Sequence, residues 1–183
     1  MIRVIVFIGA CLLMSGAASV QAEQTTRSST NSAETYQRAS DLFNKGQYAE
    51  ALLLYQYLAE QGYADAQSDL GYMYERGLGV TQNESQAVYW IWKAVEQGNA
   101  GAQNNLGVIY ANGQGLAQND NQAVYWIRKA AEQSYADAQS NLGVMYEKGL
   151  GVTKDRTQAI YWYRKAADQG SQKAMAALNK LSR

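Results

Sequence analysis

The chain has 183 residues, with 16 Lys and Arg side chains against 16 Asp and Glu, one Cys, no His and no Pro. A net charge of zero argues against a dedicated nucleic-acid binder, which needs basic residues to neutralise phosphates. The lack of His removes the commonest general base and the usual zinc ligand, and the lack of Pro leaves helix interiors unbroken. With 47% hydrophobic and 17% charged residues, the composition is typical of a packed chain, and we expect a helical binding protein.

The first residues are typical of an export signal. Arg3 precedes an apolar run over residues 4–13, and small residues then lead to Val20-Gln21-Ala22, which fits a signal-peptidase site. We predict a signal peptide over residues 1–22, cleaved after Ala22, and a periplasmic or secreted mature protein. The apolar run is shorter than the roughly 20 residues that span a bilayer, so no membrane span is expected in the mature chain.

Two features adjoin this segment. Cys11 loosely fits a lipoprotein acylation motif, but little apolar sequence precedes it, and cleavage after Ala22 would leave no cysteine in the mature chain. Residues 23–32 are polar and aperiodic, which predicts a flexible leader.

A motif recurs with a step of 36 residues along the rest of the chain. Each copy contains A-x-A-Q, a Leu-Gly pair three residues later, then G-x-G and Tyr-Trp, and the copies begin at Ala64, Ala100 and Ala136. Apolar residues within each copy are spaced as on two helices. Each copy is therefore predicted to be a helical hairpin, and the hairpins must stack to bury their apolar faces.

The expected helix ends are also marked. One column before the second helix holds residues suited to N-capping, namely Asn83, Asn119 and Asp155. The column after the second helix, where a left-handed residue is favoured, holds Gly62, Gly98, Ser134 and Gly170.

These residues together resemble the Sel-one-like repeat (SLR), a relative of the tetratricopeptide repeat (TPR). Full copies are predicted over residues 63–98, 99–134 and 135–170, after a TPR-like hairpin over 33–62 and before a capping helix over 171–183. The resemblance implies an all-α fold, a right-handed α–α superhelix (a solenoid of helical hairpins). Its concave surface, lined by the first helix of each hairpin, is expected to receive a protein or peptide partner of unknown identity.

No motif for catalysis stands out. The chain has no S-x-x-K and no G-x-S-x-G sequence, and its G-x-G turns lack the third glycine of a dinucleotide fingerprint. We expect no enzymatic activity, no cofactor and no metal site. A cysteine-rich branch of the family is associated with penicillin binding and weak β-lactamase activity, but no repeat here contains Cys. A peptidoglycan- or β-lactam-binding protein with at most weak hydrolase activity remains an alternative, as does a secreted host-interaction factor.

Candidate groove residues follow from laying the TPR pattern on each predicted first helix. They are Asp65, Ser68, Tyr72, Glu75 and Arg76 in the first copy; Gly101, Asn104, Val108, Ala111 and Asn112 in the second; and Asp137, Ser140, Val144, Glu147 and Lys148 in the third. The residue types at these candidate positions differ between copies, whereas those at the packing positions repeat. This fits either a groove adapted to a partner or side chains that vary because they are exposed to solvent.

Aromatic residues and charge complete the pattern. Trp90, Trp126 and Trp162 are predicted to pack between repeats rather than to form a sugar-binding stripe.

Residues 23–75 carry three basic and eight acidic side chains, and residues 131–183 carry eight basic and five acidic. The net charges of −5 and +3 predict an oriented, salt-sensitive encounter with a complementary partner, or head-to-tail self-association.

Overall fold

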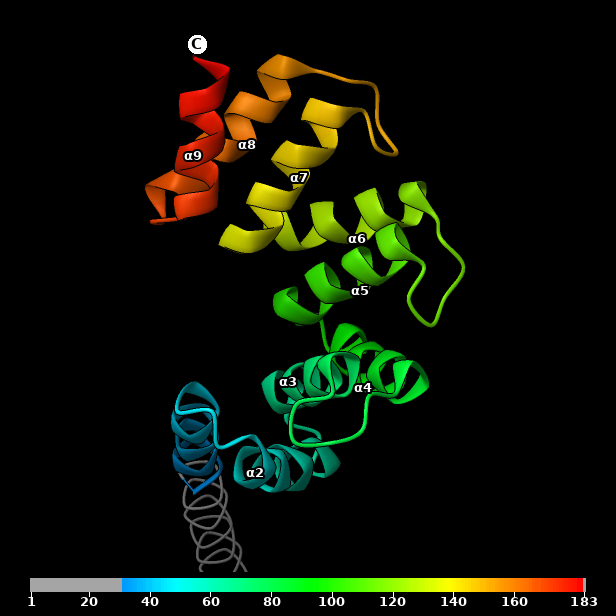
Figure 1. The fold of residues 1–183 in the computed structure, drawn as a ribbon, viewed down its shortest axis with the longest axis vertical. Helices are drawn as coiled ribbons and strands as arrows, with labels where there is room; N and C mark the ends of the chain where they lie inside the picture. Colours follow the sequence, from blue (N-terminus) through cyan, green and yellow to red (C-terminus); the bar gives the residue numbers. More distant parts are fainter. Residues whose placement is uncertain (1–30, 183) are drawn as a thin grey trace, which may run out of the picture.

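The computed structural model describes residues 31–182, and the regular secondary structure within that range is entirely helical (Figure 1). The predicted signal peptide and its cleavage site after Ala22 lie outside the described residues. A helix over residues 31–44 is followed by α2 (Tyr48–Glu60), α3 (Ala64–Arg76), α4 (Glu84–Glu96), α5 (Ala100–Asn112), α6 (Asp120–Glu132), α7 (Ala136–Lys148), α8 (Arg156–Asp168) and α9 (Gln172–Leu181). None of the described helices combines the length and apolarity needed to cross a membrane.

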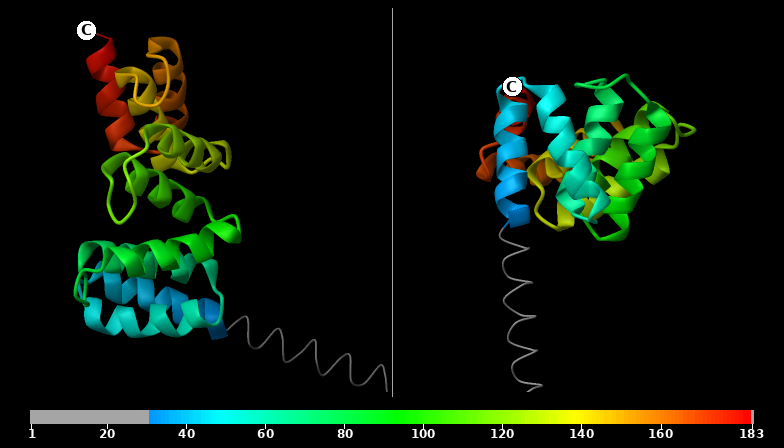
Figure 2. Two further views of the ribbon diagram at one scale, coloured as in Figure 1. Left: turned by 90° about the vertical axis from the view of Figure 1, so that its right-hand side faces the viewer. Right: turned by 90° about the horizontal axis from the view of Figure 1, so that it is seen from below.

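Successive helices pack as antiparallel hairpins that stack into a superhelix, as predicted. Residues 31–44 and α2 lie at one end and α8 and α9 at the other, and the views in Figure 2 show the same stack from the side and from below. The first helices α3, α5 and α7 also approach one another directly. They therefore form the inner layer of the curved stack, and α4, α6 and α8 form the outer layer.

The Leu-Gly pair of each repeat marks the place where the two helices of a hairpin touch. Leu70, Leu106 and Leu142 are fully buried. A Cβ on Gly107 would lie 2.5 Å from Ile127 Cγ1 and 2.9 Å from the carbonyl oxygen of Ala123, both on α6. Only a residue without a side chain allows the helices to approach this closely, which explains why the glycine recurs.

The Gln of each A-x-A-Q motif joins the two helices of its own hairpin, and Gln67 and Gln139 also reach the preceding hairpin. Gln67 is 4% exposed, donates to the carbonyl oxygen of Ala59 at 3.0 Å, and accepts from Gln97 Nε2 at 2.8 Å. The equivalent Gln133–Gln103 and Gln169–Gln139 bonds are also 2.8 Å long. A buried amide with both ends partnered fixes the register between hairpins.

The predicted helix ends are confirmed. The side chains of Asn83, Asn119 and Asp155 accept the backbone N–H three residues later at 3.0, 3.1 and 3.0 Å. The column after the second helix has a positive φ throughout, at Gly62 (88°), Gly98 (80°), Ser134 (65°) and Gly170 (90°).

The tryptophan prediction is also confirmed. Trp90, Trp126 and Trp162 are each half-buried and pack against the apolar cluster that includes the preceding hairpin. Their neighbours Tyr89, Tyr125 and Tyr161 are about half exposed, at 50%, 47% and 48%. The ammonium group of a Lys one turn later lies 5.0–5.3 Å from each of these tyrosine rings.

Candidate functional site: the concave groove

A cavity of about 550 Å³ lies on the inner surface, where α3, α5 and α7 approach one another. Each of these helices contributes side chains near its N-terminal end, and the helix over residues 31–44 adds Tyr36. The lining consists of Tyr36, Asp65, Ser68, Asp69, Tyr72, Asn99, Ala100, Gly101, Asn104, Asn105, Tyr135 and Asp137. Three hairpins and the preceding helix are therefore needed to build it.

The cavity is acidic and aromatic. Its lining, all within the described residues, contains the carboxylates of Asp65, Asp69 and Asp137 and no Lys or Arg. Three tyrosines add ring surface and hydroxyl groups. Burial raises the pKa of the Tyr135 hydroxyl, and the negative charges of Asp137 and Asp69 raise it further. The site therefore favours positive over negative charge.

Hydrogen bonds hold two of the carboxylates in place. Asn99 Nδ2 donates to Asp65 Oδ1 at 2.6 Å, and the Tyr36 hydroxyl donates to Asp69 Oδ2 at 2.8 Å. Burial raises the pKa of Asp69 above its ordinary value, and the nearby charge of Asp65 acts in the same direction, whereas the hydrogen bond from Tyr36 lowers it. Asp69 is thus a partly desolvated carboxylate whose charge is incompletely compensated.

The structure brings six of the sequence-predicted residues together in this cavity, namely Asp65, Ser68, Tyr72, Gly101, Asn104 and Asp137. Sequence reasoning missed Asp69, which lies one turn after Asp65 on α3, and Asn99 and Tyr135, which are the residues just before α5 and α7. The spacing of four residues between the two aspartates was the available signal for Asp69, because such residues share a helix face.

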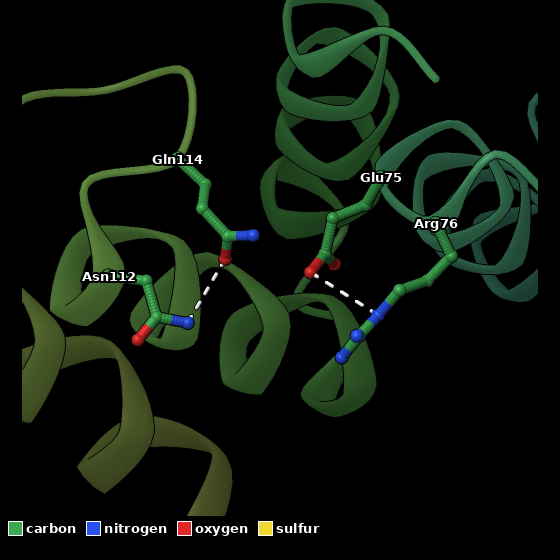
Figure 3. Close-up of polar contacts among 4 residues, drawn as sticks. All are labelled: Glu75, Arg76, Asn112 and Gln114. Carbon is green, nitrogen blue, oxygen red and sulfur yellow. Dashed lines mark hydrogen bonds and ion pairs between the residues drawn. The ribbon is translucent and has the colours of Figure 1, made fainter. Parts of the chain in front are cut away.

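A second group of predicted residues lies at the C-terminal ends of α3 and α5 (Figure 3). Glu75 is 6% exposed, and its Oε1 lies 3.6 Å from Arg76 Nε. Burial raises the pKa of Glu75, and the charge of Arg76 partly offsets this. Asn112 Nδ2 donates to Gln114 Oε1 at 3.0 Å, and Figure 3 shows the Gln114 side chain directed toward Glu75.

In the third copy most of the predicted groove residues lie outside the acidic cavity. Ser140 is 1% exposed, and Val144 packs against the apolar cluster of α8 and α9. Glu147 accepts from the Tyr163 hydroxyl at 2.7 Å. Glu147 and Lys148 line a separate cavity of about 550 Å³ with Lys154, Arg156, Lys180 and Leu181. Helix α9 thus covers part of the inner surface, and the cavity beside it is basic.

The remaining predicted residues, Val108 and Ala111, are half-buried on α5 and line neither of these two cavities. Within residues 31–182, no cluster of Cys, Asp and Glu side chains is arranged to hold a metal ion.

This architecture defines an α-solenoid, in which helical hairpins stack through shared packing columns and expose a variable inner surface. The chain belongs to the Sel1 repeat family, whose model matches residues 44–63, 64–99, 100–135 and 136–171. The first match covers part of the segment predicted to be TPR-like. No curated protein sequence matches the chain.

Solved structures support the same conclusion. The chain is similar to a Sel1 repeat protein from Oxalobacter formigenes, with 39% identity and a TM-score of 0.66 over 76% of this chain and 58% of that one. It is also similar to c5321, a protective antigen present in uropathogenic Escherichia coli strains, with 43% identity and a TM-score of 0.63 over 67% of this chain and 26% of that one. The chain therefore spans less than two thirds of either protein.

Helicobacter pylori cysteine rich protein B is a more distant match. It is 22% identical, with a TM-score of 0.52 over 78% of this chain and 96% of that one. This likeness shows the fold alone. The chain's single cysteine, Cys11, lies outside the described residues.

Proposed function

We propose that the protein is an exported, non-enzymatic scaffold that binds a protein or peptide partner in its concave groove and acts as an adaptor or regulator in the cell envelope. The observation that carries the proposal is the polar cavity built jointly by α3, α5 and α7. Its side chains differ from copy to copy, whereas the packing residues repeat. Repeat proteins use such extended concave surfaces for recognition.

Family membership supports this reading, because Sel1 repeat proteins in general are protein-interaction scaffolds. A fold does not by itself imply a function, so the proposal depends on the groove residues. Export is supported by the apolar run over residues 4–13 and the small residues that lead to Ala22. The lack of a recognisable nucleophile motif supports a binding role over a catalytic one.

The charges of the two inner cavities support an oriented encounter. The cavity at α3, α5 and α7 is lined by three carboxylates, and the cavity beside α9 is lined by Lys148, Lys154, Arg156 and Lys180. A partner with the complementary charge order would be steered into one orientation. Its affinity is expected to fall with rising ionic strength, because salt screens exposed charges beyond about 8–10 Å.

Photocrosslinking in the native host tests the proposal. A photoreactive residue is placed at Tyr72 or Asn105, which line the acidic cavity, and at Tyr89, which is exposed on α4, as a matched control. We expect one envelope protein to be captured from Tyr72 and Asn105 and not from Tyr89. Capture from Tyr89 alone would assign binding to the outer surface and refute the proposal. Recovery of the protein in the cytoplasmic fraction would refute export.

A further inference from the structure

The middle repeat leaves space where its neighbours carry carboxylates. Asp65, Gly101 and Asp137 occupy one column at steps of 36 residues, and all three line the acidic cavity. A Cβ on Gly101 would lie 3.3 Å from Asn99 Oδ1, 3.6 Å from the Tyr135 hydroxyl and 3.7 Å from Ser68 Oγ. The position therefore faces a ring of polar groups, and the missing side chain leaves room for a ligand among them.

Two buried polar side chains point to such a ligand. Ser68 is 7% exposed and Asn104 is 6% exposed, and both line the cavity. Asn104 Oδ1 accepts from Asn141 Nδ2 at 2.9 Å. Within the described residues, neither the Ser68 hydroxyl nor the Asn104 amide nitrogen has a hydrogen-bond partner. The two side chains are largely buried and line the cavity, so a ligand in it can pair with these free polar atoms.

The charge of the cavity selects the sign of that ligand. Asp65 and Asp137 lie in the first turns of α3 and α7, where the helix dipole alone favours an acidic residue. Asp69 lies in the middle of α3, and its burial is unfavourable for the charged form, so helix stability does not account for it. The N-termini of α3, α5 and α7 each add about half a positive charge, and the three carboxylates outweigh their sum.

The aromatic groups suit a cationic side chain. Tyr36, Tyr72 and Tyr135 all line the cavity, and cations are attracted to the faces of such rings. The guanidinium carbon of Arg76 lies 5.6 Å from the centroid of the Tyr72 ring and already faces one side of it, so Tyr36 and Tyr135 are the rings left to a ligand. The hydroxyl oxygen of Ser68 can accept from a cation, and the Asn104 amide can donate to a carbonyl oxygen of a peptide backbone.

We propose that this cavity receives one Arg or Lys side chain of a partner peptide, with Asp65 and Asp69 binding its charge and Asn104 binding its backbone. This proposal rests on the proposed function, since it specifies the kind of segment that the groove recognises. It also assigns the specificity to a single pocket built by residues 65–72 of α3 and 99–105 around the start of α5, rather than to the overall charge of the protein.

The probes are acetylated, amidated pentapeptides of sequence Gly-Ser-X-Ser-Gly, in which X is Arg, Lys or citrulline. Citrulline keeps the shape of Arg and removes its charge. Each peptide is titrated into the ¹⁵N-labelled protein, and amide shifts are followed by NMR. We expect the Arg and Lys peptides to shift amides in residues 65–72 and 99–105, and the citrulline peptide to bind at least tenfold more weakly.

Three variants test the pocket. Asp69→Asn removes its most buried charge and keeps an acceptor for Tyr36, and Gly101→Leu fills its centre. Glu96→Gln makes the same charge change at an exposed position on α4. We expect at least fivefold weaker binding of the Arg peptide by the first two variants and unchanged binding by the third. Spectra with unchanged signals outside the pocket verify that each variant is folded.

The outcomes separate this proposal from the function on which it rests. Equal binding of the Arg and citrulline peptides, or equal weakening by Asp69→Asn and Glu96→Gln, would overturn the cation pocket. If Tyr72 still captures its partner equally well in the Asp69→Asn variant, groove binding stands and the pocket assignment is wrong. If the Arg peptide binds as expected but no envelope protein is captured, the pocket stands and the proposed function is wrong.

Discussion

Helix α5 carries two glycines whose replacement by alanine is expected to change stability in opposite directions. At Gly107 a Cβ would lie 2.5 Å from Ile127 Cγ1 and 2.9 Å from the carbonyl oxygen of Ala123. The carbonyl belongs to the backbone of α6, so relief requires the two helices to move apart. At Gly101 the nearest atom, Asn99 Oδ1, would be 3.3 Å away, so the Asn99 side chain, which caps α5 by accepting from the Ala102 N–H, would have to shift only slightly.

The magnitude follows from two opposing terms. Alanine favours a helix over glycine by about 1 kcal/mol, and overpacking in a close contact costs about 1–3 kcal/mol. We therefore expect Gly107→Ala to lower the free energy of unfolding, by up to about 2 kcal/mol. Gly101→Ala has only the small shift of Asn99 to oppose this gain and should raise the free energy of unfolding by up to about 1 kcal/mol.

Urea unfolding followed by far-ultraviolet circular dichroism measures both variants against the native chain, with coincident fluorescence transitions as the test of two-state behaviour. The same substitution in the same helix removes helix propensity as an explanation for any difference between them. If Gly107→Ala proved as stable as Gly101→Ala, the close approach of α5 and α6 would not be what requires glycine in the Leu-Gly pair.

Three further outcomes are expected. Gln103→Ala removes the acceptor that lies 2.8 Å from Gln133 Nε2 and should lower the free energy of unfolding by about 1–2 kcal/mol; an unchanged urea midpoint would contradict its role in joining α5 to the end of α6. Ser134→Gly relieves a φ of 65° and should stabilise by about 0.5–1 kcal/mol, and the reverse change Gly98→Ser should destabilise comparably. Because burial raises the pKa of Asp69 above 3.8, the folded chain binds this proton more tightly than the unfolded chain, and the contribution of Asp69 to stability falls as pH rises above that value. The Asp69→Asn variant should therefore exceed the native chain in free energy of unfolding by more at pH 7 than at pH 4. An equal difference at both pH values would show that burial does not raise the pKa of Asp69.

The helices and their ends follow from local interactions and are readable in the sequence. Asn119 caps α6 because its side chain reaches an N–H only three residues away, and apolar residues at helical spacing, such as Ala87, Ile91 and Ala94 on α4, keep one face of each second helix apolar. A step of 36 residues repeats these local signals, so each column supports the others. The stacking of hairpins follows because a single hairpin cannot bury its own apolar face.

Which side chains line the groove depends on contacts between helices that are distant in the sequence. Asp65 and Ser68 share the cavity with Gly101 and Asp137 only because successive hairpins stack in one register, which the Asn99–Asp65 and Asn141–Asn104 hydrogen bonds connect. The predicted groove position Val144 packs instead against the apolar cluster of α8 and α9.

The sequence alone therefore determined the repeat, the helix boundaries and the packing columns, because these depend on spacing within about 36 residues of chain. Tertiary structure decided which polar side chains meet in one cavity and which are covered, because this depends on how hairpins stack and where the last helix lies. Asp69 illustrates the difference. In the sequence, Asp69 looks like any polar residue of a helix. Its burial beside Tyr36 and Asp65, which only the tertiary structure shows, makes it a candidate binding group.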